Sequence, residues 1–290
     1  MRFAVTLVLW LFTTVALAVA VPAAWAQLNI VNEDGYAALA QKAAGDPALQ
    51  SAAAGELTTR AIALIAAHEG GKHPVNGSQV HDVAAAFTAG PSFPPLFADA
   101  NRAAHRYLFS ETSSGDGWVI DVAPMLKDSA FEQILSSHNV KAPATLTVPL
   151  TVSLPTRGTP VGPVRQGQLS RLAAWGPWVS MGAAALSGLF GLLTLAAARR
   201  RGKALTSLGV SALLVGAAGW AGIEVGGRFI NDVLNGTTGD IRQIADVMVR
   251  YAEAGMHFWL NLTLIAGVVL VGFGVLVAIL GSVLKKDKRT

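Results

Sequence analysis

The stretch FWLNLTLIAGVVLVGFGVLVAILGSVL, residues 258–284, contains no charged side chain. A helix needs about 20 mostly apolar residues to cross roughly 30 Å of hydrocarbon. Three other stretches reach that length, at residues 3–26, 172–198 and 204–225, and among them only the last contains a charge, Glu224. The sequence therefore predicts three or four transmembrane helices and a membrane protein of the mainly α class.

The composition supports a membrane protein. Of the 290 residues, 52% are hydrophobic and 14% are charged, whereas soluble domains carry about 25% charged residues. These values exclude a disordered chain and argue against an ordinary cytosolic enzyme. The chain has no cysteine, which excludes disulfides, thiolate zinc sites and iron–sulfur clusters.

The chain divides into three parts. Residues 1–26 form an N-terminal anchor or a signal peptide, because Ala24-Trp25-Ala26 matches an A-x-A cleavage site after an apolar run. Residues 27–163 form a polar domain. Residues 164–290 form the membrane domain, with spans near 172–198, 204–225 and 258–284 and a loop over 226–257. Cleavage after Ala26 would leave three spans, and retention would leave four.

Basic residues predict the orientation of the spans. Arg2, the cluster from Arg199 to Lys203 and the cluster from Lys285 to Arg289 together hold nine basic residues and one acidic residue, Asp287. Cytoplasmic loops are enriched in Lys and Arg, so we expect both termini to be cytoplasmic and residues 27–163 to be extracytoplasmic in a multi-pass plasma-membrane protein. The pI of about 9.6 then reflects this topology, so we expect no nucleic-acid partner. We expect the basic clusters to contact anionic lipid headgroups of the bilayer.

The extracytoplasmic domain has the pattern of a mostly helical α+β domain with a small sheet. The sequence predicts five helices: one at 33–44, one that begins at Asp46-Pro47, one that Ser78 caps and that runs through Phe87, one at 93–108 and one near 124–137. It also predicts paired strands at 118–122 and 145–154. In the loop 226–257, an apolar stripe indicates an amphipathic helix, formed by Ile241, Ile244, Val247, Met248 and Tyr251. This helix either packs under the large domain or lies on the bilayer surface.

The N-terminal half also carries an ordered set of short motifs. They are Ala24-Trp25-Ala26, Asn29-Ile30-Val31-Asn32-Glu33-Asp34-Gly35-Tyr36, Asp46-Pro47-Ala48-Leu49-Gln50, Leu57-Thr58-Thr59, Phe97, Ala100-Asn101-Arg102-Ala103-Ala104-His105 and Val119-Ile120-Asp121-Val122-Ala123-Pro124. In this order they resemble a group of uncharacterised actinobacterial integral membrane proteins. The resemblance covers roughly residues 24–124. It implies an N-terminal hydrophobic segment, an extracytoplasmic domain and C-terminal spans, and it implies no catalytic residue.

Two groups of polar residues are candidate sites. Asn101, Arg102 and His105 lie within about one turn of the helix at 93–108 and form either a ligand or partner patch or a set of hydrogen bonds that fixes the fold. Glu224, Asn261 and Thr263 lie at similar levels on the last two spans and form a candidate intramembrane polar cluster.

A third group, His68, His73 and His81 with Glu69, does not have the spacing of a zinc protease. In the HExxH motif the two histidines are four residues apart, whereas His68 and His73 are five apart, with two glycines between them. The sequence therefore predicts no metal site, no cofactor and no catalytic residue. An enzyme would have to bring Asp99, His105 and Asp121 together in a pocket.

These features favour a non-catalytic accessory or scaffold protein in cell-envelope processes. Its expected partners are the bilayer and other membrane or envelope proteins. Small residues in the spans, such as Ala184 and Gly188, leave homo-oligomerisation open. The main alternative is a transporter or channel subunit lined by Glu224, Asn261 and Thr263. A second alternative is an extracytoplasmic enzyme or sensor.

Overall fold

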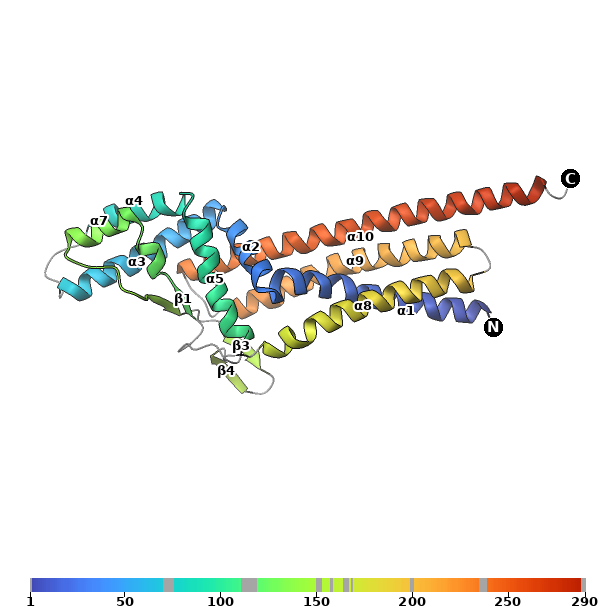
Figure 1. The fold of residues 1–290 in the computed structure, drawn as a ribbon, viewed down its shortest axis with the longest axis horizontal. Coiled ribbons are helices and arrows are strands. Elements are labelled where there is room, and N and C mark those ends of the chain that lie inside the picture. The colour runs from blue at the N-terminus through green and yellow to red at the C-terminus, as the bar shows by residue number, and fades with distance from the viewer. Residues whose placement is uncertain are drawn as a thin grey trace. The chain divides into compact units, whose positions relative to one another are not determined.

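The computed structural model describes residues 2–69, 76–110, 119–149, 153–156, 159–163, 167, 169–198, 201–234 and 239–287. The chain forms two compact units (Figure 1). The membrane unit comprises Met1–Leu28, Ala174–Arg228 and Glu253–Thr290. The polar domain comprises Asn29–Ala173 and Phe229–Ala252.

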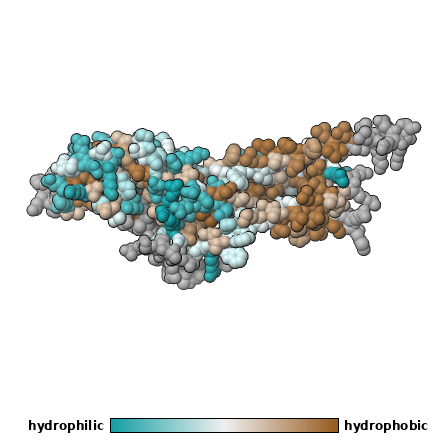
Figure 2. Space-filling view, in the orientation of Figure 1, coloured by the Kyte–Doolittle hydropathy of each residue, from teal (hydrophilic) through white to brown (hydrophobic). Residues whose placement is uncertain are grey.

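Four long helices supply the membrane unit. They are α1 (Arg2–Ala26), α8 (Ser170–Ala197), α9 (Arg201–Leu234) and α10 (Gly239–Asp287). All four are long and apolar enough to cross a membrane, and the visible surface of the membrane unit is largely hydrophobic (Figure 2). The protein is therefore a multi-pass membrane protein, and the prediction of apolar spanning helices is confirmed.

Helix α1 packs within the membrane unit through polar and aromatic contacts. The Trp10 indole donates a hydrogen bond to the Ser207 carbonyl at 2.8 Å. The hydroxyls of Thr14 and Ser211 are also 2.8 Å apart. Residues 24–26, the A-x-A sequence, lie at the end of α1, and a π-helical turn over Gln27–Val31 continues the helix.

Helices α9 and α10 pack closely because glycines face each other. A Cβ atom at Gly209 would lie 2.7 Å from the Gly267 carbonyl oxygen, and one at Gly267 would lie 2.9 Å from the Gly209 oxygen. Real Cβ atoms do not come within 3.0 Å of such atoms, so this crossing requires the absence of both side chains. Small residues allow this kind of close approach between membrane helices.

The polar domain is built from helices α2 (Glu33–Ala43), α3 (Pro47–Glu69), α4 (Gly77–Thr88), α5 (Phe93–Phe109), α6 (Ala123–Leu126) and α7 (Ser129–Ser137). The predicted start at Asp46-Pro47 is confirmed, and an Asp46 carboxylate oxygen accepts from the Ala48 amide at 2.9 Å. The predicted Ser78 cap is wrong. Asn76 caps α4 through the Gln79 amide, and the Ser78 hydroxyl donates to Asn76.

The core of the polar domain is a cluster of buried side chains from several helices. Leu49, Leu57 and Ile65 of α3 are fully or almost fully buried. Phe87 of α4 meets Phe93 of α5 at a ring-centroid distance of 5.9 Å and Phe131 of α7 at 5.7 Å, both edge-on. Edge-to-face packing is a favoured geometry for aromatic rings.

The predicted α+β class with a small sheet is wrong, because helices make up nearly all of the described chain and no sheet layer is present in it. The extended segments are β1 (Val119–Asp121), β2 (Thr147–Pro149), β3 (Ser153–Thr156) and β4 (Thr159–Pro163). They pair only two by two, β1 with β2 and β3 with β4, as short antiparallel ladders. Prolines contribute to this shortness, since they cannot donate to a ladder.

The loop segment that precedes the last span packs against the polar domain, which is the first of the two predicted alternatives. In the first four turns of α10, Val247 is buried in the core of the polar domain. Ile241, Ile244, Met248 and Tyr251 are partly buried against the same core. Helix α10 thus contributes its residues up to Ala252 to the polar domain and the later ones to the membrane unit.

Candidate functional site

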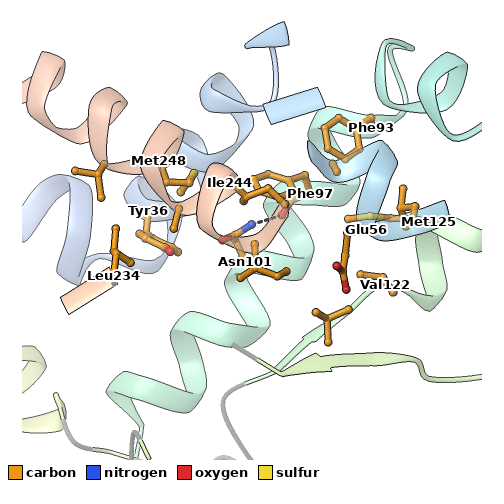
Figure 3. Close-up of a pocket in the computed structure, with 16 residues that line it drawn as sticks. Tyr36, Glu56, Phe93, Phe97, Asn101, Val122, Met125, Leu234, Ile244 and Met248 are labelled. Atoms are coloured by element: carbon orange, nitrogen blue, oxygen red, sulfur yellow. Dashed lines mark hydrogen bonds between the residues drawn. The ribbon is translucent and has the colours of Figure 1, made fainter. Parts of the chain in front are cut away.

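The polar domain contains a cavity of about 270 Å³ with largely apolar walls (Figure 3). Helix α5 contributes Phe93, Phe97 and Asn101, whose spacing of four residues keeps them on one helix face. The other lining residues are Tyr36 of α2, Ala53, Glu56 and Leu57 of α3, Met125 of α6, Val122 and Val148, Leu234 of α9, and Ile241, Ile244, Ala245, Met248 and Val249 of α10.

Three lining residues carry a polar group. The Glu56 carboxylate accepts from Arg60 at 2.7 Å, and its side chain is 15% exposed. The Asn101 amide nitrogen donates to the Phe97 carbonyl at 2.8 Å within the same helix. Burial raises the pKa of Tyr36 to about 12, so its phenol is neutral at physiological pH. The cavity therefore offers few hydrogen-bonding groups to a ligand.

His105 lies one helical turn beyond Asn101 and outside the cavity lining. Its Nε2 is 2.9 Å from the Ile30 carbonyl oxygen, and because a carbonyl only accepts, Nε2 carries the proton that is donated. The ring stacks on Phe109 at 4.2 Å and lies 5.2 Å from the Tyr36 ring. Burial lowers the pKa of His105, and the hydrogen bond to Ile30 and the charge of Glu33 act in the opposite direction. This histidine joins α5 to the segment before α2.

The structure separates the three residues of the predicted ligand or partner patch. Asn101 lines the cavity, and His105 bonds to Ile30. Arg102 is partly exposed and donates to Asp99 at 2.6 Å and to Asp34 at 3.4 Å. Two of the three side chains thus have contacts that fix α2 against α5, and Asn101 alone faces the cavity. A binding role for this patch remains a prediction.

The three residues that an enzyme would have to use serve different local structures. The Asp99 side chain is 66% exposed and pairs with Arg102. Asp121 accepts from the backbone amides of Ala123 at 2.9 Å and Leu146 at 2.8 Å, which fixes the start of α6. With His105 bound to Ile30, each group already has a partner within the fold, and neither carboxylate lines the cavity.

The intramembrane polar residues contact other partners rather than each other. Asn261 accepts from the Trp220 indole at 3.2 Å, and the Thr263 hydroxyl donates to the Trp259 carbonyl at 2.9 Å. Glu224 is exposed, and no described residue forms a hydrogen bond or ion pair with it. Whether the three residues act together remains a prediction.

Sequence reasoning missed His257 in the membrane unit. Its ring stacks on Trp220 with a centroid distance of 4.0 Å. Its Nε2 is buried without a hydrogen-bond partner. A histidine directly before the uncharged run at 258–284 is the signal that could have drawn attention to it.

The histidine group lies partly outside the described residues. His68 is exposed near the end of α3, the His81 ring is 3.4 Å from the Thr58 hydroxyl, and His73 lies outside the described residues. Within the described part of the chain, no group of three or more His, Asp or Glu side chains could hold a metal ion.

Sequence reasoning also missed most of the cavity. It identified Asn101 as a candidate and Ile241, Ile244 and Met248 as an apolar stripe, but it did not place them around one space. Glu56 belongs to no motif, and Tyr36 ends the motif Asn29–Tyr36, to which the resemblance gives no site role. The only usable signal was that the stripe on α10 needs an apolar partner.

Comparison of the chain with protein-family models, with curated proteins and with solved structures finds no match. The resemblance to actinobacterial membrane proteins therefore stays a prediction, and the geometry of the cavity is the basis for the function proposed next.

Proposed function

We propose that the protein is a membrane-anchored, non-catalytic accessory or scaffold protein whose polar domain binds a partner in the cell envelope at the outer face of the plasma membrane. One observation carries the proposal. The polar domain has an apolar cavity, while the predicted acid–base candidates Asp99, Asp121 and His105 lie outside its lining and hold local structure. Such a domain is suited to binding more than to catalysis.

The distribution of tryptophan supports the proposed orientation. Trp25 lies near the end of α1, Trp175 and Trp178 near the start of α8, and Trp220 in the second half of α9. These positions are at the helix ends opposite the basic cluster at residues 199–203. Trp175 and Trp178 are 67% and 70% exposed, as expected for an aromatic belt at a membrane–water interface. Such belts form at both interfaces, so the proposed side rests on the basic cluster, because cytoplasmic loops are enriched in Lys and Arg.

Cysteine labelling tests this orientation directly, because the native chain has no cysteine. Ser51 on α3 and Lys203 on α9 are both exposed, so each position is accessible once a reagent reaches its side of the membrane. A membrane-impermeant maleimide on intact cells should label Ser51→Cys and leave Lys203→Cys unlabelled until the cells are permeabilised. The reverse pattern would rule out the orientation.

The side chains in the spans support an anchor more than a transport pathway. Pathways through membranes are lined with polar groups. In the membrane unit, the Thr13, Thr194 and Thr263 hydroxyls each donate to a carbonyl of their own helix, and these bonds leave little polar lining for a solute.

Partner capture tests the accessory role. The tagged full-length chain is crosslinked in native membranes, and the co-purified proteins are compared with those from an unrelated tagged protein with four spans. We expect reproducible enrichment of envelope proteins. Recovery of no partner, together with solute flux in proteoliposomes that contain this chain alone, would replace the accessory role with transport.

A further inference from the structure

We propose that the cavity of the polar domain binds a single aliphatic chain, supplied by a membrane lipid or by a free fatty acid. The inference rests on the proposed function, because it names a ligand of the same non-catalytic domain. It follows from the chemistry of the lining, from the volume of the cavity and from the nature of the protein as a multi-pass membrane protein.

The lining favours an uncharged apolar group. Aliphatic side chains of α10 line the cavity, among them Ile241, Ile244 and Val249. Phe93 and Phe97 of α5 also line it (Figure 3). No Lys or Arg is among the lining residues that the structure describes. The Glu56 carboxylate is paired with Arg60, and the nearby Asp240 carboxylate adds no cation. A bare anionic headgroup would therefore lose its hydration in the cavity without gaining a cation from the lining. A hydrocarbon chain carries no charge and has no such cost.

Two methionines make the lining adaptable. Met125 of α6 and Met248 of α10 both contact the cavity. Methionine is unbranched and polarisable, so it fills irregular gaps and accommodates ligands of varying shape. A flexible chain with several conformers is the kind of ligand that such walls accommodate. Each methylene of the chain would gain dispersion contacts with side chains that line the cavity.

The volume fits one chain. An apolar cavity of about 150 Å³ holds a benzene molecule, and this cavity has about 270 Å³. It therefore has space for an apolar group larger than a single ring, such as a chain segment, but it is below the size of the larger small-molecule sites, which reach about 1,000 Å³. Two chains side by side would need more space.

The position of the lining in the chain points to lipid as the source. Leu234 and Val249 line the cavity, and both belong to helices long and apolar enough to cross a membrane, α9 and α10. Val249 precedes the uncharged run at 258–284 by nine residues. Membrane lipid is the largest supply of aliphatic chains available to such a protein.

The polar groups of the lining are compatible with the end of such a chain. Asn101 and Glu56 are the hydrogen-bonding groups of α5 and α3 in the lining, and the Tyr36 phenol is a third. An ester, an alcohol or a protonated acid at the end of the chain could bond to one of these groups without bringing a net charge into the cavity.

The test uses the full-length protein in native-membrane nanodiscs prepared without detergent, since a detergent tail would compete for the cavity. Two photoactivatable probes are compared, a phospholipid with a diazirine in its acyl chain and a free fatty acid with the same group. Mass spectrometry then locates the crosslinks. We expect crosslinks within residues 241–249 of α10 and at Met125.

Variants that fill the cavity provide the decisive comparison. Ala53→Phe and Ala245→Phe place a ring into the cavity from α3 and α10, and we expect crosslinking at Met125 to fall roughly tenfold in each. Ala63→Phe is the matched control, because Ala63 is exposed on the same helix as Ala53, and it should crosslink like the native chain. Circular dichroism identifies a variant that fails to fold. In that case, crosslinking of the other cavity-filling variant tests the inference.

The outcomes separate this inference from the proposed function. Crosslinks at Met125 and residues 241–249 that decline in a folded filled variant support the inference. The probe that gives the stronger crosslink at equal concentration identifies the source of the chain. Equal crosslinking in native and filled proteins, or no crosslink to the lining, would overturn it. Partner capture is a separate measurement in native membranes, so either proposal can fail while the other holds.

Discussion

The two units of the molecule place the same kinds of side chain in opposite positions. In the polar domain, Phe93 and Phe131 are 0% exposed. In the membrane unit, Trp178 is 70% exposed and Leu192 is 67% exposed. Large apolar surface of this kind is stable only in a hydrocarbon environment, where its exposure carries no cost. Burial of an apolar side chain therefore indicates that it stabilises the polar domain, whereas exposure of an apolar side chain in the membrane unit does not indicate instability.

Polar side chains are paired within the protein in both units, and the polar domain also uses them to cap its helices. In the polar domain, Asn32, Asn76 and Asp128 accept from backbone amides at helix starts, where unpaired donors need partners. In the membrane unit, Thr13 and Thr194 donate to the carbonyl four residues earlier. Water is absent from the hydrocarbon region, so a polar group there must find its partner inside the protein.

The largest expected effect concerns α1, which decides whether the membrane unit has three or four spans. Trp10 and Thr14 bond to α9, and Ala24–Ala26 lies in continuous helix, whereas proteolysis favours exposed, irregular backbone. We expect residues 2–26 to be retained. Intact mass measurement of protein purified from membranes checks this, and a chain that begins at Gln27 would leave three spans.

The next largest effect tests the contrast in burial. Phe131→Ala in the polar domain should lower the free energy of unfolding by roughly 3–5 kcal/mol, because it removes a fully buried ring and leaves a cavity. Trp178→Ala in the membrane unit removes an exposed ring, and its cost should stay below about 0.5 kcal/mol. Hydrogen exchange of α7 and α8 amides in the full-length protein measures both. A similar loss of unfolding free energy in the two variants would contradict the difference between the two units.

A smaller effect tests what holds the membrane unit together. Gly209→Leu would place a side chain against the backbone of Gly267, and overpacking of this kind costs roughly 1–3 kcal/mol. Gly222→Leu on the same helix is the control, because no atom lies within 4 Å of the added Cβ. Thermal unfolding of both variants in nanodiscs gives the difference. Equal stability would mean that the α9–α10 crossing is not close.

Elements that depend on local pattern could be predicted from the sequence. Uncharged runs locate the spanning helices, and Asp46-Pro47 locates the start of α3. The predicted strands at 118–122 and 145–154 do pair, over Val119–Asp121 and Thr147–Pro149, but the α+β class was wrong, because helices form most of the core. Only Thr147–Pro149 of that run pairs with β1, and tertiary context overrides strand propensity.

The cavity could not be predicted, because its walls come from segments far apart in the chain. Tyr36, Asn101 and Met248 meet only once α2, α5 and α10 have packed. An apolar stripe such as that on α10 shows that a helix face needs a partner, but it does not identify the partner or show whether space remains between them. Polar residues were easier to find, yet most of them serve the fold.

The smallest expected effect is a pH dependence that comes from His105 in the polar domain. Burial lowers its pKa below the ordinary value of about 6.5, because the buried ring between Tyr36 and Phe109 favours the neutral form, and the Ile30 carbonyl and Glu33 only partly oppose this. The folded state thus binds fewer protons than the unfolded state just below pH 6.5. The stabilisation is fully present above that pH and is lost as the pH falls through the lowered pKa.

His105→Gln tests this dependence, since glutamine does not titrate and its amide can still donate to the Ile30 carbonyl. The free energy of unfolding, measured by hydrogen exchange of α5 at pH 7.5 and at lower pH, should fall less in the variant than in the native chain. The effect should be modest, because a single buried side chain differs between the two proteins. An identical decline in the two proteins would assign the acid sensitivity to other groups. A variant that is destabilised equally at every pH would instead show that the ring contacts with Tyr36 and Phe109 matter more than the proton.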